Sequence, residues 1–245
     1  MFEKLKRAIK DFSEGKFIMV YDQDDREAEV DLVVLAEKVT PNHVYHLRHD
    51  AGGLICIAMA NEISKTLELP FMLDIYNKIS NIYSIFNHCS PDAAMPYGDK
   101  PSFSITINHI NTYTGITDND RALTISEFGK LGNEIVNNGS NISKYQKVFG
   151  SNFRAPGHTH LLIAAKGLLA ERKGHTELTV SLAVIGNKML GLEITPCTVL
   201  CEMLDGNTGK ALSLEKAKEY AQKHDIIMIN GKEITEAFEY IMRAQ

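Results

Sequence analysis

Six carboxylates and one arginine crowd into residues 22–31, DQDDREAEVD, and the apolar run 32–36 follows directly. Carboxylates packed beside a strand that must be buried repel one another, and a bound cation is the simplest relief. In an extended chain Glu27, Glu29 and Asp31 point to one face and Arg26 to the other. The segment therefore predicts a divalent-metal or acid/base site with a cationic neighbour for an anionic substrate. An acidic turn that only leads into a strand is the alternative.

The segment 154–160, RAPGHTH, is the second stretch dense in reactive groups. Proline and glycine fix a turn, so Arg154 and His158 on its two sides are held at a defined separation. An arginine, a hydroxyl and free backbone N–H groups suit a phosphate, and an imidazole beside them suits a metal. A surface turn with an incidental histidine is an equally good explanation. His160 enters the following strand and is expected to be a bystander.

The segment 174–177, GHTE, precedes an apolar helix at 178–185. Either His175 or Thr176 could cap that helix, and Glu177 falls in its first turn, where a carboxylate complements the helix dipole. This structural explanation is complete without any chemistry. The functional alternative is a phosphate or oxyanion site at the same backbone amides, with Glu177 as an acid or base.

Three weaker features complete the set. The polar turn 112–121, which contains Thr114, could line a sugar pocket or only cap a helix. Cys56, after Gly52-Gly53, is expected to be a small core residue rather than a nucleophile. Residues 205–209 predict a hairpin or turn. The chain has no P-loop, G-x-G-x-x-G, H-E-x-x-H or G-x-S-x-G motif. Nucleotide hydrolysis, dinucleotide redox, zincin and serine-hydrolase chemistry therefore lack support.

The composition is that of an ordinary globular protein, with 44% hydrophobic and 23% charged residues. A net charge of -5 and a sequence pI near 6.0 argue against a nucleic-acid binder, which needs a basic surface. No apolar run approaches the length of a membrane span, and the N-terminus is not a signal peptide, so a cytoplasmic protein is expected. We expect buried free thiols at the four cysteines Cys56, Cys89, Cys197 and Cys201.

Periodicity and turn residues place these segments on alternating elements. Helices are expected at 2–14, 41–48, 62–68, from 118 or 120 to 131, 176–186, 213–223 and 235–243. Strands are expected at 16–21, 32–36, 54–58, 103–107, 161–165, 198–202 and 226–229. Residues 75–101 read as a long loop or partly helical excursion, and 137–151 as a loop or hinge. The irregular alternation predicts one α+β domain over residues 1–245, with a mixed sheet and helices packed around it.

In this order, the dense segments resemble 3,4-dihydroxy-2-butanone-4-phosphate synthase of riboflavin biosynthesis. The resemblance rests on DRExExD at 25–31, GLIC at 53–56, PGH at 156–158 and GHTE at 174–177, and covers roughly residues 5–230. It continues through Thr114-Gly115 with Asp120-Arg121, and through Cys201-Glu202 with Asp205-Gly206. Residues 75–101 and 102–108 look like the archaeal branch. With no fused GTP cyclohydrolase II domain after them, a single-function form is expected.

The resemblance implies an α/β sandwich that converts D-ribulose 5-phosphate to formate and 3,4-dihydroxy-2-butanone 4-phosphate with Mg²⁺ or Mn²⁺. It implies Glu27 and His158 as metal ligands, and Arg26 and Arg154 as contacts to substrate and phosphate. It implies acid/base roles for Glu29, Asp31 and Glu177. Around the sugar phosphate it places Thr114, Thr159 and Thr176, with Asp31 as a further contact and His175 and Cys56 as pocket wall. It also implies a homodimer with residues of both subunits at each site.

The chain departs from the family pattern at two places. Most members have Asn and Gly where this chain has Ala28 and Val30, and Val30 would replace a residue free to take a positive φ. Ala155 is inserted between Arg154 and Pro156. Two other functions remain open from the residues alone: another metal-dependent sugar-phosphate isomerase or aldolase, and a non-catalytic binding or structural protein.

Overall fold

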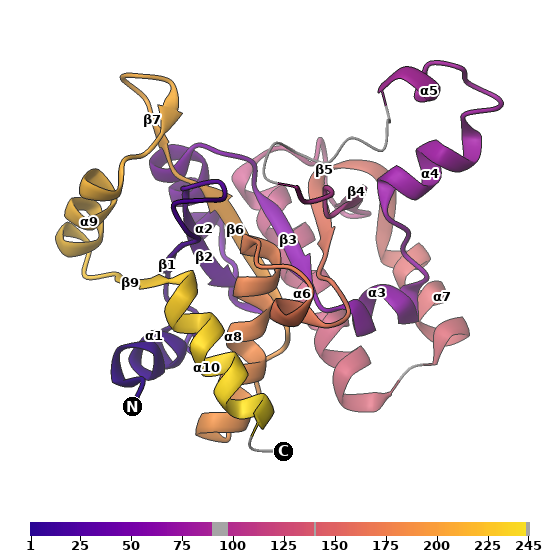
Figure 1. Ribbon diagram of the computed structural model, residues 1–245. Helices are drawn as coiled ribbons and strands as arrows, with labels where there is room; N and C mark the ends of the chain where they lie inside the picture. The colour runs from indigo at the N-terminus through magenta and orange to yellow at the C-terminus, as the bar shows by residue number, and fades with distance from the viewer. Residues whose placement is uncertain (90–97, 140, 244–245) are drawn as a thin grey trace.

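The protein is built around one seven-stranded mixed sheet, seen in a computed structural model that describes residues 1–89, 98–139 and 141–243 (Figure 1). The strand order is β4-β5-β3-β6-β2-β1-β9. Pairing is parallel for β3 with β5 and for β1 with β9, and antiparallel for the other pairs. The strands are β1 Ile18–Tyr21, β2 Val30–Leu35, β3 Cys56–Met59, β4 Phe103–His109, β5 Phe153–Ile163, β6 Cys197–Glu202 and β9 Ile227–Asn230.

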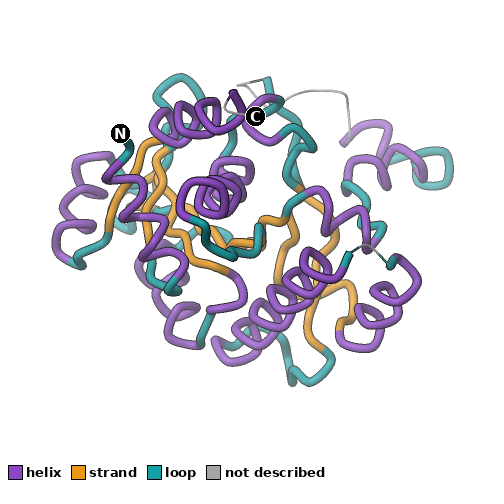
Figure 2. The backbone as a smooth tube through the Cα atoms, turned by 90° about the horizontal axis from the view of Figure 1, so that it is seen from below, coloured by secondary structure: helices purple, strands orange, loops and turns teal. Residues whose placement is uncertain are grey.

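Helices cover both faces of this sheet, which is why its strands are apolar on both sides (Figure 2). Leu32 and Val34 of β2 enter one core, and Val33 and Leu35 enter the other. The first core is closed by α2 Pro41–His46, α3 Asn61–Leu67, α6 Asp118–Asn138, α7 Ile142–Asn152 and α9 Leu214–Lys223. The second is closed by α1 Glu3–Ser13, α8 His175–Leu190 and α10 Gly231–Arg243. The predicted α+β fold with a mixed sheet is confirmed.

Side-chain caps begin two of the expected helices. Thr40 caps α2, with Pro41 in the first turn, and Ser213 caps α9. The hairpin predicted at 205–209 is present, and its turn connects β7 Leu204–Asp205 with β8 Lys210–Ala211. The prediction of Asp118 or Asp120 as the cap of the helix expected from 118 or 120 is wrong: the cap of α6 is Thr117, whose Oγ1 accepts the N–H of Asp120.

The expected loop at 137–151 is wrong, because α6 continues to Asn138 and α7 occupies 142–152. Asn141 caps α7 through the N–H of Lys144, so one of the asparagines that suggested a loop starts a helix. The excursion expected at 75–101 includes the second part of α4 Met72–Ile79 and all of α5 Phe86–Cys89, and both helices stand away from the sheet in Figure 1. Residues 90–97 of that prediction lie outside the described residues.

The turn predicted at 154–160 is also wrong, because the chain runs on through β5 without reversing. Thr159 pairs with Ile107, but the next paired residue in β5 is Arg154, opposite Asn108. Residues 155–158 therefore form a bulge. Side chains of β4 replace the missing backbone bonds: Thr106 Oγ1 accepts the N–H of Gly157 at 3.1 Å, and Asn108 Oδ1 accepts that of His158 at 2.8 Å.

The cysteines are free, as expected, and Cys56, Cys197 and Cys201 are buried. The expectation is wrong for Cys89, which is exposed at the end of α5. Among the described residues, no helix combines the length and the apolar character that a membrane crossing requires.

Candidate active site

Asp22, directly after β1, organises the acidic segment. Its buried carboxylate accepts the N–H of Glu27 at 3.0 Å and that of Glu29 at 3.1 Å. Residues 24–27 form turns, so the extended conformation expected for the whole segment begins only at Val30. Ala28 has a φ of 55°, which places the left-handed residue two positions before the one expected at Val30. The loop therefore folds around the Asp22 carboxylate.

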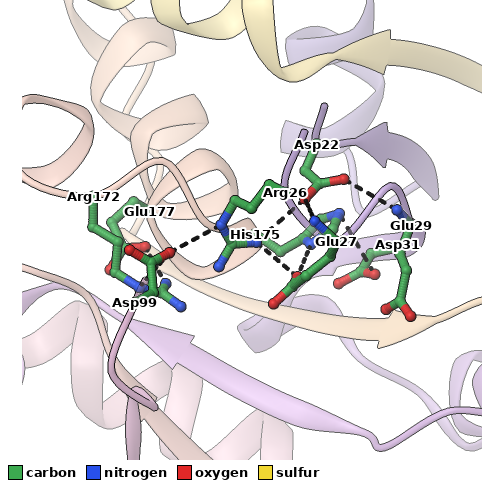
Figure 3. A network of polar contacts seen from close by, with 9 residues as sticks. All are labelled: Asp22, Arg26, Glu27, Glu29, Asp31, Asp99, Arg172, His175 and Glu177. Atoms are coloured by element: carbon green, nitrogen blue, oxygen red, sulfur yellow. Dashed lines mark hydrogen bonds and ion pairs between the residues drawn. The ribbon is translucent and has the colours of Figure 1, made fainter. Parts of the chain in front are cut away.

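Arg26 lies inside this loop with only 5% of its side chain exposed. Its Nη1 contacts Glu27 Oε2 at 2.7 Å and Asp22 Oδ2 at 3.3 Å, and its Nε donates to Asp99 Oδ2 at 3.0 Å. The guanidinium thus faces the carboxylates rather than pointing away from them. Figure 3 shows the resulting row of side chains, from Glu177 and Arg172 to Asp31 and Glu29.

His175 enters the same cluster from the first turn of α8. Its Nδ1 lies 3.2 Å from Glu27 Oε2, and its Nε2 lies 3.7 Å from Asp31 Oδ1. Burial disfavours the charged imidazole, but the charge of Asp31 and the hydrogen bond to Glu27 outweigh that cost and raise the pKa of His175 to about 9. The helix cap is Gly174, which leaves the His175 side chain directed at the carboxylates and corrects its prediction as a cap.

Asp31 is completely buried on β2, and neither of its carboxylate oxygens has a hydrogen-bond partner among the described residues. Burial raises its pKa to about 7, with Glu202, Glu27 and Glu29 adding to the rise and His175 opposing it. Glu202 lies beside it because the two residues pair across β2 and β6. Burial, Glu27 and Glu202 also raise the pKa of Glu29. These carboxyl groups therefore keep protons at higher pH than exposed ones.

Glu177 is fully buried in the first turn of α8. Its Oε1 accepts the N–H of Ala165 at 2.9 Å, and its Oε2 pairs with Arg172 Nη1. Burial raises its pKa, although Arg172 and the Ala165 N–H oppose the rise. Glu177 and Arg172 line a cavity of about 230 Å³ between α4, residues 100–102, the end of β5 and the start of α8. Glu177, the predicted acid/base residue, therefore lines this cavity and is held in an ion pair with Arg172.

One set of three ligand atoms suited to a cation occurs in the described residues: those of Asp22, Glu27 and His175 lie within 4.8 Å of one another. His158, the predicted partner of Glu27, is not in this set. It lies on β5, which is separated from β2 by β3 and β6, a distance of about 14 Å at ordinary strand spacing.

The predicted phosphate and metal residues of the second segment form their own cluster at the edge of the sheet. Arg154 Nη2 donates to the backbone oxygen of Thr112 at 3.2 Å and to its Oγ1 at 3.1 Å. His158 is exposed, and its Nδ1 lies 3.1 Å from the Asn108 amide nitrogen. Because Asn108 Oδ1 accepts the His158 N–H, its amide nitrogen must donate to the ring, which favours the proton on Nε2. Thr114 lies nearby, with its N–H bonded to Asp120.

The remaining predicted residues lie inside the protein. Thr159 and Thr176 are buried, on β5 and in the first turn of α8. Cys56 begins β3 opposite His160, and burial raises the pKa of its thiol well above the usual value, which fits a core residue.

Three residues of the acidic cluster received no role from the sequence, although Glu202 lies in a segment that carries the resemblance. Glu202 could have been found from the pairing of two predicted strands, and Arg172 from its place before the GHTE segment. Asp99 carries no local signal, because its ion-pair partners Arg26 and Arg172 are far from it in the chain.

The site combines buried carboxyls of raised pKa with a charged histidine and two arginines, at one end of the mixed sheet. This combination is typical of an enzyme that performs acid–base chemistry on an anionic substrate. A family model described as 3,4-dihydroxy-2-butanone 4-phosphate synthase matches residues 6–237, nearly the whole chain. The chain belongs to the 3,4-dihydroxy-2-butanone 4-phosphate synthase family.

Curated relatives agree with this membership. A protein of that name from Methanothermobacter thermautotrophicus is 42% identical over 234 residues, which cover 96% of this chain and 95% of the relative. One from Methanosarcina mazei is 46% identical over 237 residues, covering 96% and 91%.

Solved structures of the same name share the fold. The synthase of Candida albicans has 27% identity and a TM-score of 0.69, with 95% of each chain covered. Another, described as a complex with two magnesium ions, has 24% identity and a TM-score of 0.67 over 93% of each chain, and supports the fold alone. The predicted family is confirmed, and the chain is a lyase of riboflavin biosynthesis.

Proposed function

We propose that the chain converts D-ribulose 5-phosphate to formate and 3,4-dihydroxy-2-butanone 4-phosphate by proton transfers at the buried carboxyls around His175. The observation that carries this proposal is Asp31, which is buried, has no hydrogen bond to either oxygen among the described residues, and has a pKa raised to about 7. A carboxyl that titrates near neutral pH both accepts and releases protons readily. An Asp in a purely structural role would have its oxygens hydrogen-bonded.

This reaction needs more than one acid or base, because an enediol forms, water leaves, the carbon skeleton shifts and C4 departs as formate. Asp31 and Glu29, with raised pKa values in adjacent positions, are our candidates for taking and returning protons. His175, charged at neutral pH, supports negative charge that develops on substrate oxygens. Glu177 is our third candidate, from the other end of the row. Arg26 is the proposed contact to the substrate.

The donor set also fits a divalent cation. Carboxylate oxygens with an imidazole are ordinary ligands of Mg²⁺ and Mn²⁺, and we assign Glu27 and His158 as the residues that hold the ion. Asp22 is less suited, since its oxygens already bind backbone N–H groups, and a charged His175 has no lone pair to offer. When bound, such a cation supplies positive charge to adjacent oxygens of the sugar.

We further propose a homodimer in which the cluster of Arg154, His158 and Thr114 works beside an acidic cluster. Large apolar side chains are exposed next to it: Tyr113 is 95% exposed, and Ile110 and Ile116 are about half exposed. Such a patch on a soluble domain is typical of a protein interface. Thr159 and Thr176 are proposed to shape the pocket around the sugar phosphate, with Cys56 in its wall.

The test is formate release from ribulose 5-phosphate with Mg²⁺, since isomerases and aldolases release none. Mixing the inactive Glu27→Gln and His158→Asn variants then locates the two ligands. If they meet across a dimer interface, half of the sites in mixed dimers have both native residues, and activity returns. If one chain supplies both, every site in the mixture lacks one ligand, and no activity returns. Absence of formate from the wild type would refute the proposed reaction.

A further inference from the structure

Two arginines meet at the N-terminus of α8. A methyl group added at Gly174, the helix cap, would lie 2.2 Å from Arg172 Nη1 and 2.7 Å from Arg26 Nη2. The two guanidinium groups therefore occupy the space that any side chain at Gly174 would need. Both positive charges lie at the helix end that already carries a positive partial charge. This arrangement requires negative charge close to both groups.

Asp99 supplies that charge to both arginines. Its Oδ2 lies 3.0 Å from Arg26 Nε and 3.5 Å from Arg172 Nε (Figure 3). Arg26 and Arg172 each have a second carboxylate of their own, Glu27 and Glu177 respectively. Among the described residues, Asp99 is the carboxylate that ion-pairs with both arginines. It thereby connects the acidic loop with the start of α8.

The ion pairs of Asp99 with Arg26 and Arg172 lie between two cavities. Arg26, Asp99 and Arg172 line one of about 340 Å³, and Arg172 and Glu177 line the other, of about 230 Å³. Arg26 is 5% exposed and Glu177 is fully buried, while Asp99 itself is 28% exposed. Arg26 and Glu177, the groups proposed to act on the substrate, are therefore buried. Asp99, which connects them through Arg172, is partly exposed.

We propose that Asp99 is a positioning residue that fixes the Arg26 guanidinium and, through Arg172, the Glu177 carboxylate at one spacing. This inference rests on the proposed function, in which Arg26 contacts the substrate and Glu177 transfers a proton. In this assignment Asp99 acts through the two arginines and not on the substrate or the cation itself. Without its charge, the two arginines repel each other, Arg26 loses its ion pair with Asp99, and Arg172 is pushed from Glu177.

The experiment compares Asp99→Asn with Asp225→Asn, an exposed aspartate whose left-handed φ of 52° asparagine also accepts. For Asp99→Asn we expect kcat to fall about tenfold and KM for ribulose 5-phosphate to rise about fivefold, because misplaced groups weaken both binding and catalysis. A loss of folded protein would lower kcat at unchanged KM. Asp99→Glu should restore part of the loss, and the control should match the wild type.

A double variant tests the connection to Arg172. Arg172→Gln combined with Asp99→Asn should cost no more than the worse single variant, since both break the same chain of contacts. Additive losses would overturn the proposal.

Hydrogen exchange provides a readout that needs no turnover. In Asp99→Asn, the amides of Glu27 and Glu29 should exchange about tenfold faster, as the loop loses the ion pair of Arg26 with Asp99. Unchanged exchange at both amides would overturn the proposal. If wild-type protein released no formate, the proposed function would fail, and the exchange result alone would decide the role of Asp99.

Discussion

Nε2 of His175 lies 3.7 Å from Oδ1 of Asp31, and neither atom has a hydrogen-bond partner among the described residues. Both side chains are buried, one on α8 and one on β2. The charge of Asp31 raises the pKa of His175 to about 9, and burial raises the pKa of Asp31 to about 7. The folded site therefore holds more protons than the unfolded chain at neutral pH.

This excess predicts that the metal-free protein becomes less stable from pH 6.5 to pH 9. The stability that His175 contributes is complete below its unfolded pKa of 6.5 and is lost as the pH rises through about 9. The contribution of Asp31, whose pKa rises from 3.8 to about 7, is lost in the same direction. Thermal unfolding between pH 6 and 9 should show a falling Tm. Asp31→Asn should flatten the curve, because it removes both contributions, whereas the exposed His88→Gln should leave it unchanged. A Tm that rises over this range would contradict the assigned shifts.

Removal of the cation or of either assigned ligand should stop formate release. Glu27→Gln, His158→Asn and EDTA should each lower turnover by about 10²–10³-fold or more, because each removes charge stabilisation at the reacting oxygens. Adding Mg²⁺ or Mn²⁺ should reverse the effect of EDTA and not that of the substitutions. Glu236→Gln, at an exposed site on α10, is the matched control. A well-folded Glu27→Gln variant with near-normal turnover would show that the ligand assignment is wrong.

The residues that are adjacent in sequence were the predictable part of this site. The concentration of carboxylates at 22–31, the first turn of α8 and the apolar strands follow from spacing and charge, which act over a few residues. The turns at 24–27 and the direction of Arg26 do not. The bulge at 155–158 did not follow, since Pro156 and Gly157 fit a turn as well as a bulge. The bulge is determined by β4, where Thr106 and Asn108 accept the backbone N–H groups of Gly157 and His158. Asp99 could not be predicted either, because its role depends on contacts that are 73 residues apart in the chain.

Ala28 is a strained position, so glycine there should stabilise the protein and valine should destabilise it. With a φ of 55°, its Cβ crowds the backbone, at a cost of about 1 kcal/mol. Ala28→Gly should therefore raise the free energy of unfolding by about 0.5–1 kcal/mol, whereas the β-branched Ala28→Val should lower it by at least about 1 kcal/mol. Urea denaturation of the three proteins measures both values. Equal stability of all three would mean that the loop takes another conformation in solution.

Gly157 is where the close approach of β5 to β4 leaves no room for a side chain. An added Cβ would lie 2.0 Å from the Ile107 carbonyl carbon and 2.3 Å from the Asn108 nitrogen. Both contacts are with backbone, so the strands must move apart. Gly157→Ala should lower the free energy of unfolding by about 2 kcal/mol or more, at the upper end of single-substitution effects.

The same substitution should also impair formate release in protein that remains folded, because the N–H of His158 would lose Asn108. Gly150→Ala is the control: it lies inside α7 with open space around its Cβ position, and should stabilise the protein by about 0.5–1 kcal/mol through helix propensity. Opposite signs for the two glycines, measured by urea denaturation, would confirm that the bulge at 155–158 holds His158 in place. A Gly157→Ala variant as stable and as active as the wild type would show that the strands are not packed this closely.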